Sequence, residues 1–232
     1  MQISSNPLHE TLAEELIQSQ PEDLIRHGQT VARLTTDLAE AAGCPPVEQS
    51  RIHTGSLLHD IGKQFIPTSI LEKQDKLSPS EFSRIQQHPW FGYVYLTSFV
   101  SDATVLNTIL YHHERWNGTG YPFGLAGEQI PLGARICALA DVWDALVSDR
   151  CYRSAWSLTQ ALDLIWAGAG SLFDPQLAYQ FLNIIETQYG GTKAVQTRDV
   201  PAFPWAGRAA PAWEGIPLST RRSPRKAKPA AQ

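Results

Sequence analysis

The chain contains only three cysteines, Cys44, Cys137 and Cys151, and no two of them form a C-x-x-C pair. An odd number of cysteines without that spacing argues against a disulfide framework and against a cysteine-ligated zinc site. Free thiols suit a reducing compartment, so we expect a cytoplasmic protein.

The sequence also lacks an apolar run of the about 18 residues that a membrane span requires. Its first residues, MQISSNPLHETLAEE, are polar and acidic, without the basic and apolar regions of a signal peptide. We therefore expect neither a membrane span nor a cleaved leader. With 43% apolar and 18% charged residues in 232, the composition is that of a globular protein rather than a disordered one.

Negative charge is scarce at one end of the chain. Residues 193–232 carry eight Lys or Arg and two Asp or Glu, a balance of +6, whereas residues 1–192 carry a balance of −10. The basic end is rich in proline and shows no apolar period, which predicts a flexible tail over residues 191–232. The acidic body argues against nucleic acid as a partner, except through this tail.

Helical signals dominate the body, where apolar residues recur at three- and four-residue steps. Capping-box patterns at residues 19–22 (SQPE) and 78–81 (SPSE) predict helix starts, and the first helix should run to about Ala42. Asp174-Pro175 predicts another helix that ends at Gly190-Gly191.

LNTILYHHERW (106–116) and RICALADVWDALVSD (135–149) are helical by the same period, whereas Pro89 disfavours helix at His88. No segment alternates convincingly and no internal repeat is present. The fold class is therefore all-α: a compact bundle over residues 20–190, preceded by an extension (1–19), with one irregular glycine-rich loop near residues 115–134.

Histidines fall on inward faces of these predicted helices. His27 shares an apolar stripe with Leu34, and His113 shares one with Leu106, while His112 lies about 100° around the same helix. A lone inward histidine is more often a hydrogen-bonded core residue than a ligand. A larger set of imidazoles and carboxylates at helical positions is harder to explain in that way; it comprises His27, His59, Asp60, His88, His112, His113 and Asp141.

Imidazole and carboxylate donors without thiolate suit Fe, Mn, Zn or Ni better than Ca or Mg. Seven candidate ligands exceed the needs of one ion with open positions, whereas two ions require about this number, with one carboxylate bridging them. Asp144, three residues after Asp141, is a further acid that requires a cation or a donor if it is buried.

Three segments together resemble the HD-GYP domain, a branch of the HD superfamily of metal-dependent phosphohydrolases. They are HDIGK (59–63), HHERWNGTGYPFGLAGEQIP (112–131) and ARICALADVWDALVSDRCYR (134–153). The resemblance covers residues 20–188. It implies a helical bacterial signalling domain that hydrolyses cyclic di-GMP to pGpG or GMP through a hydroxide that bridges two metal ions, commonly iron or manganese.

Residue roles follow from the resemblance, position by position. His27, His59, Asp60 and Asp141 match the ligands of one ion, with Asp60 bridging to a second ion that matches His88, His112 and His113. The resemblance also implies Asp60 and Lys63 as catalytic residues and Arg150, Arg153, Gly120, Tyr121 and Pro122 as substrate-binding residues. Two cations beside a phosphodiester would lower the pKa of a bridging water and neutralise the charge that grows on the phosphoryl oxygens.

Some positions depart from the family pattern. Asp23 stands one turn before His27, where members with a third ion have glutamate, so a third ion depends on a shorter side chain. Cys151 replaces the usual proline.

The role of Glu114, which follows the twin histidines, has two alternatives: it either orients a ligand histidine or forms a surface ion pair. No receiver, GAF, PAS or membrane sensor precedes the domain, so we expect input through a signalling partner or homodimer, through the tail, or through substrate supply.

Two alternatives to cyclic di-GMP hydrolysis stay open. One is a phosphohydrolase or phosphodiesterase that acts on another nucleotide, such as cyclic GMP-AMP. The other is a catalytically weak scaffold that signals through protein contacts, which loss of ligands would have favoured.

Overall fold

The computed structural model describes residues 13, 15–149 and 154–189. Arg150, Arg153, Cys151 and the predicted tail lie outside the described residues, and the domain bounds at residues 20 and 190 stay a prediction. The all-α prediction is confirmed, because the described part of the chain forms helices and only two isolated β-bridges, Asn117–Ala126 and Ala169–Phe173. None of the helices in these ranges is long and apolar enough to cross a bilayer.

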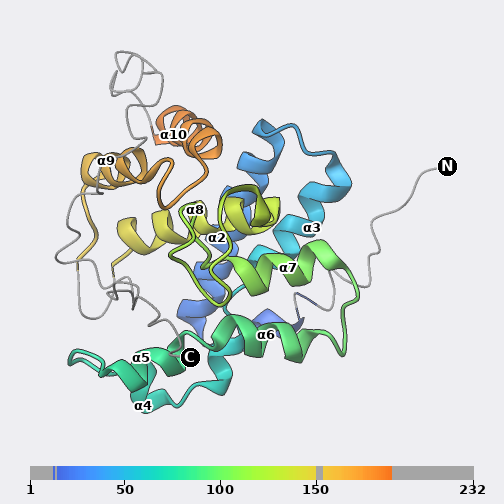
Figure 1. Cartoon of the computed structure of the whole chain (residues 1–232), viewed down its shortest axis with the longest axis vertical. Coiled ribbons are helices and arrows are strands. Elements are labelled where there is room, and N and C mark those ends of the chain that lie inside the picture. The colour runs from blue at the N-terminus through green and yellow to red at the C-terminus, as the bar shows by residue number, and fades with distance from the viewer. Residues whose placement is uncertain (1–12, 14, 150–153, 190–232) are drawn as a thin grey trace, which may run out of the picture.

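The helices follow one another along the chain (Figure 1). Their bounds are α2 Glu22–Ala41, α3 Pro46–Leu57, η1 Ile61–Phe65, α4 Thr68–Leu71, α5 Pro79–Ile85, α6 His88–Leu96, α7 Ala103–Tyr111, η2 Gly127–Gln129, α8 Leu132–Val147, α9 Leu158–Gly168 and α10 Pro175–Tyr189. A long irregular loop joins α7 to η2.

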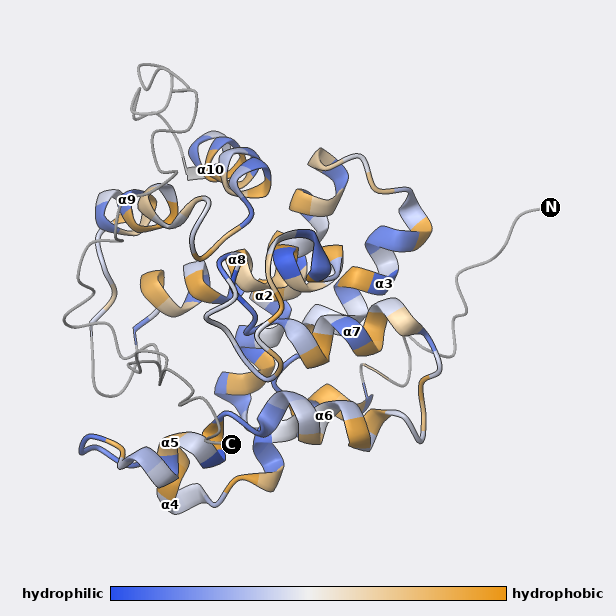
Figure 2. Cartoon of the chain, in the orientation of Figure 1, coloured by the Kyte–Doolittle hydropathy of each residue, from blue (hydrophilic) through white to orange (hydrophobic). Residues whose placement is uncertain are grey.

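Two apolar clusters hold the bundle together. One joins α2 and α8 to α9 and α10, and at its centre Trp143 and Phe181 meet edge to face with ring centroids 5.8 Å apart. The other joins the end of α3, η1, α6 and α7, and it includes Ala13 and Ile17 from the predicted N-terminal extension. In Figure 2 the helices α9 and α10 carry hydrophobic and hydrophilic residues on different sides, as expected for helices that cover one side of a core.

The predicted capping box at Ser19 is wrong. Residues 15–18 are helical, and the Ser19 hydroxyl donates to the carbonyl oxygen of Leu16 instead of accepting from the next helix. Helix α2 begins at Glu22 after Pro21, with acidic residues in its first turn that favour the helix dipole. At Ser78 the prediction is confirmed, because the Ser78 and Glu81 side chains cap each other's backbone N–H groups.

The prediction that Pro89 keeps His88 out of a helix is also wrong. Helix α6 starts at His88, so the proline occupies the first turn. A proline is tolerated there because the first-turn N–H groups have no intrahelical acceptor. Helix α5 ends at Ile85, and the break between the two helices turns His88 toward the core.

Candidate metal centre

The seven candidate side chains converge from five separate segments. They form what we call the imidazole–carboxylate cluster: His27 on α2, His59 and Asp60 after α3, His88 at the start of α6, His112 and His113 after α7, and Asp141 on α8. Three sets within it have ligand atoms that all lie within 4.8 Å of one another: His27, His59 and Asp141 (the His27 group); His88, His112 and His113 (the His88 group); and His59, Asp60 and His112.

The twin histidines do not lie on a helix, contrary to the prediction. Helix α7 ends at Tyr111, and His112 is its C-cap residue. His112 is buried and His113 is half-buried, so the helical wheel misidentified which of the two faces inward most. Beyond the helix end both rings can approach the same place, and their centroids lie 4.1 Å apart.

A glycine allows two of these segments to meet. A β-carbon at Gly62 would lie 2.0 Å from the carbonyl oxygen of His88 and 2.5 Å from the amide nitrogen of Gly92. Only glycine therefore lets η1 approach α6 this closely. The approach places Asp60, two residues earlier, with its Oδ1 atom 3.2 Å from His88 Nε2.

Backbone carbonyls fix the tautomer of three of the imidazoles. Each Nδ1 lies within hydrogen-bond distance of the carbonyl oxygen three residues earlier, at 2.7 Å for His59–Ser56, 2.8 Å for His88–Ile85 and 2.7 Å for His112–Ile109. A carbonyl only accepts, so each Nδ1 carries the proton. In the neutral form of each ring, Nε2 is then unprotonated and faces the cluster, as it does in metal-binding histidines.

Two pairs of Nε2 atoms in the cluster lie so close together that a proton or a metal ion must offset their repulsion. His88 Nε2 is 3.3 Å from His112 Nε2, and His27 Nε2 is 3.2 Å from His59 Nε2. Two nitrogen lone pairs at such distances repel each other unless a proton or a metal ion lies between or beside them. The donor set therefore fits divalent metal ions on the geometry of this chain alone.

Asp60 lies between the two groups. Its Oδ1 atom faces His88, whereas its Oδ2 atom lies 3.7 Å from His27 Nε2 and 3.5 Å from His59 Nε2. Asp141 lies nearest the His27 group, with its Oδ1 atom 3.2 Å from His27 Nε2 and 3.8 Å from His59 Nε2. A carboxylate with one oxygen toward each group can bridge two ions.

The protonation states also suit cation binding. Burial would raise the pKa of Asp60, but Lys63 and the neighbouring imidazoles outweigh it and hold that pKa well below its usual range. Burial, reinforced by His88, lowers the pKa of His113 to about 3. The cluster therefore presents a charged Asp60 carboxylate and a neutral His113 ring, which are forms that bind metal.

His27 is the exception. Burial opposes its charged form, but hydrogen bonds to Asp141 and Asp144 outweigh burial and raise the pKa of His27 to about 9. A proton on His27 reduces the repulsion between its Nε2 atom and that of His59. A metal ion that binds to His27 must displace this proton.

Lys63 contacts Asp60 directly. Its ammonium group on η1 pairs with Asp60 Oδ2, and its side chain is 23% exposed. The charge thus stands at the partly exposed rim of the cluster.

The loop after His113 is held by Glu114, whose role neither sequence alternative anticipated. Its buried carboxylate accepts hydrogen bonds from the backbone N–H groups of Phe123, Gly124 and Leu125 at 2.7, 3.0 and 3.1 Å. It therefore neither orients a ligand ring nor forms a surface ion pair. The signal in the sequence was an acid directly after two histidines and before a glycine-rich loop that offers free N–H groups.

The GYP turn packs against the cluster. A β-carbon at Gly120 would lie 2.4 to 2.6 Å from the backbone of residues 113–115, so a side chain has no room there. The Tyr121 ring lies 4.8 Å from the His113 ring and is 9% exposed. Pro122 is exposed. Asp23 lies one turn before His27 but belongs to none of the three sets, so its part in a third ion stays a prediction.

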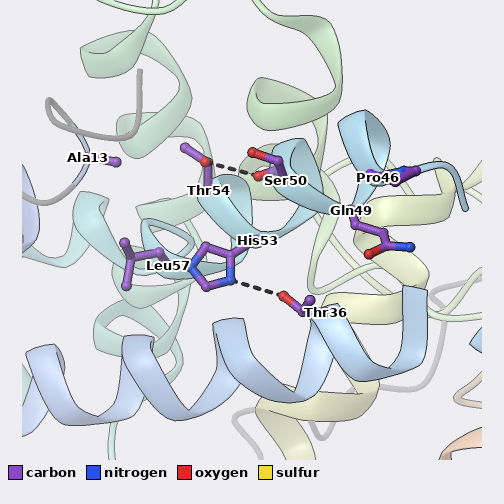
Figure 3. A pocket seen from close by; sticks show the side chains of 8 residues that line it. All are labelled: Ala13, Thr36, Pro46, Gln49, Ser50, His53, Thr54 and Leu57. Carbon is purple, nitrogen blue, oxygen red and sulfur yellow. Dashed lines mark hydrogen bonds between the residues drawn. The ribbon is translucent and has the colours of Figure 1, made fainter. Parts of the chain in front are cut away.

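A separate cavity is lined by residues outside the cluster. A space of about 390 Å³ between α2 and α3 is lined by Ala13, Thr36, Pro46, Gln49, Ser50, His53, Thr54 and Leu57 (Figure 3). His53 bonds to the Thr36 hydroxyl at 3.0 Å, and the Thr54 hydroxyl donates to the Ser50 carbonyl. This lining contains no lysine, arginine or carboxylate, so it lacks the charged groups that the cluster has.

Fold and site together define a helical domain with a buried cluster that can hold divalent metal ions. Residues 11–177 match the family described as "HD domain", and the chain therefore belongs to the HD domain family. The resemblance to HD-GYP proteins inferred from the motifs is confirmed.

Two curated proteins and one solved structure illustrate the relationship. The chain is 44% identical over 141 residues to the "Cyclic di-GMP phosphodiesterase response regulator RpfG" of Xanthomonas campestris pv. campestris (60% of this chain, 37% of that protein). It is 38% identical over 155 residues to the "3'3'-cGAMP-specific phosphodiesterase 2" of Vibrio cholerae (65% and 29%).

A solved structure is similar as well. Bd1817, a HDG"Y"P protein from Bdellovibrio bacteriovorus, aligns with a TM-score of 0.58 at 25% identity, over 70% of this chain and 52% of that one. The chain thus spans well under half the length of the two curated relatives.

Proposed function

We propose that this chain is a metal-dependent phosphodiesterase that hydrolyses cyclic di-GMP to pGpG, or onward to GMP. The observation that carries the proposal is the position of Asp60, with one oxygen facing the His27 group and the other facing the His88 group. An HD domain relative named as a cyclic di-GMP phosphodiesterase supports the substrate.

Two divalent ions, iron or manganese, would be held by residues of this chain. His27, His59 and Asp141 would hold one, His88, His112 and His113 the other, and Asp60 both. When bound, such ions make water acidic enough to attack a phosphodiester and neutralise charge on the phosphoryl oxygens.

The chain's own residues would position the substrate. Lys63 places one cation at the cluster, where it would bind a non-bridging phosphate oxygen or stabilise the leaving 3′ oxygen. Arg150 and Arg153, outside the described residues, would contribute bidentate contacts to the dinucleotide phosphates. The Tyr121 ring, packed on His113, would form one wall of the substrate site.

Cellular context belongs to the same proposal. Cys44 and Cys137 are free and buried, which supports the cytoplasmic location expected from the sequence. A signalling partner or a second copy of the chain would supply input.

The test is metal analysis of anaerobically purified protein followed by hydrolysis of cyclic di-GMP. Wild type should carry two ions per chain and form pGpG or GMP, whereas Asp60→Ala should lose both metal and turnover. The matched control is Asp75→Asn, which removes one negative charge at an exposed position. Full activity in Asp60→Ala would contradict the proposal.

A second candidate substrate is cyclic GMP-AMP, which the similarity to the Vibrio cholerae phosphodiesterase favours. The two dinucleotides share their phosphodiester linkages and differ in one base. A panel of cyclic dinucleotides assayed with Mn²⁺ or Fe²⁺ would separate the two by their kcat/KM ratios.

A further inference from the structure

We propose that Asp144 is a positioning residue that holds His27 with its Nε2 toward His59 and Asp141, and so sets the metal affinity of the His27 group alone. The inference rests on the proposed two-ion centre, but it concerns a residue outside the ligand set. Asp144 lies on α8, three residues after Asp141, and it is buried.

The carboxylate of Asp144 is fixed at both oxygens. Its Oδ2 atom lies 2.6 Å from His27 Nδ1, which donates the hydrogen bond, and its Oδ1 atom accepts from the Ser148 hydroxyl at 3.0 Å. The side chains of His27 and Asp144 are 10% and 8% exposed, so water competes little for this contact. A short charged hydrogen bond in a dry setting restricts the rotation of the ring.

His27 requires this partner because of its place in the fold. The other three fixed imidazoles lie at helix ends or turns, where a carbonyl three residues earlier reaches their Nδ1 atoms. His27 lies inside α2, whose carbonyls are engaged in helical hydrogen bonds. Its Nδ1 must therefore find an acceptor on another element, and α8 supplies one.

The acceptor also differs in charge. A carboxylate that accepts from a ligand histidine makes the ring a better electron donor to a metal ion than a neutral carbonyl does. In the His88 group, by contrast, the Nδ1 atoms of His88 and His112 bond to neutral backbone carbonyls. Removing the charge of Asp144 should therefore weaken metal binding at the His27 group and leave metal binding at the His88 group unchanged.

The experiment is a titration of metal-free wild type and Asp144→Asn with cobalt(II), followed by the d–d absorption and by the number of ions bound at limiting metal. Wild type should bind two ions. In Asp144→Asn one of the two dissociation constants should rise about 10- to 100-fold, with a changed spectrum for that site, and the other should stay. Asp75→Asn serves as the matched loss of one charge and should bind as wild type does.

A graded variant keeps the test open if Asp144→Asn does not fold. Ser148→Ala retains the carboxylate but removes one of its two anchors, and the same site should weaken by about two- to tenfold, the effect of one hydrogen bond. Unchanged affinities in both variants, or equal weakening of both sites, would overturn the inference while leaving the proposed function standing. Failure of wild type to bind two ions would overturn the proposed function and the inference together.

Discussion

Asp60 and His88 meet across two segments, with Asp60 Oδ1 3.2 Å from His88 Nε2, although 27 residues separate them in the chain. The contact depends on the close approach of η1 to α6 at Gly62. Gly62 therefore determines whether Asp60 can face both the His27 group and the His88 group.

Gly62→Ala should therefore damage both the fold and the cluster. The new β-carbon would meet the His88 carbonyl at 2.0 Å, so η1 must move away from α6. We expect a loss of about 1–3 kcal/mol in the free energy of unfolding, as for other overpacked cores, and weaker binding of both ions. Denaturant unfolding and metal titration measure the two effects. Ser98→Ala, at an exposed position after α6, should change neither; wild-type stability in Gly62→Ala would show that the segments can separate freely.

Glu114→Gln should release the GYP loop. The buried carboxylate accepts from three backbone N–H groups, and an amide offers one oxygen in place of two. Hydrogen exchange of the amides of residues 123–125 should become faster, and stability should fall by about 1–3 kcal/mol, the range for leaving a buried hydrogen-bonding group without its partner. Glu128→Gln is the control, because Glu128 is an exposed acid in the same loop. Unchanged protection of the three amides would refute this role.

Lys63→Met should separate catalysis from metal binding. The ammonium group stands at the cluster but is not a ligand, so both ions should stay bound. Turnover of cyclic di-GMP should fall by about 10²–10³-fold, the usual effect of removing one charge that stabilises the transition state. Metal content and kcat are measured on the same preparation, with Lys76→Met as an exposed control. Full kcat in Lys63→Met would show that Lys63 contacts Asp60 but does not act in catalysis.

Metal binding should release a proton, and its affinity should depend on pH. In protein freed of metal the pKa of His27 is about 9, so the ring is charged at neutral pH and must lose its proton to bind an ion. The pKa values of His59 and His112 are lowered by burial, so these rings are already neutral. The affinity of the His27 group should therefore rise about tenfold per pH unit up to about pH 9 and level off above it.

Calorimetric titration in buffers of different ionisation enthalpy counts the released protons. We expect about one proton per chain at pH 7 and none at pH 10. An affinity that does not change between pH 6 and pH 9 would mean that His27 is neutral before the ion arrives.

Much of the fold follows from local signals in the sequence. The apolar period predicts the helices, and the capping box at Ser78 begins α5 where expected, because both signals depend on interactions within a few residues. The same pattern failed at Ser19, where the preceding helical turn engages the hydroxyl. A local signal is reliable only when no neighbouring segment supplies a competing partner.

The sequence by itself determined the all-helical class and the chemical types available for a metal centre, because periodicity and residue identity are properties of the chain. The tertiary structure decided which atoms meet. The tautomers of His59, His88 and His112, the division of Asp60 between two groups, and the partners of Glu114 and Asp144 each depend on contacts between distant segments. Distances of about 3 Å between such segments are set by packing, which a pattern along one chain does not encode.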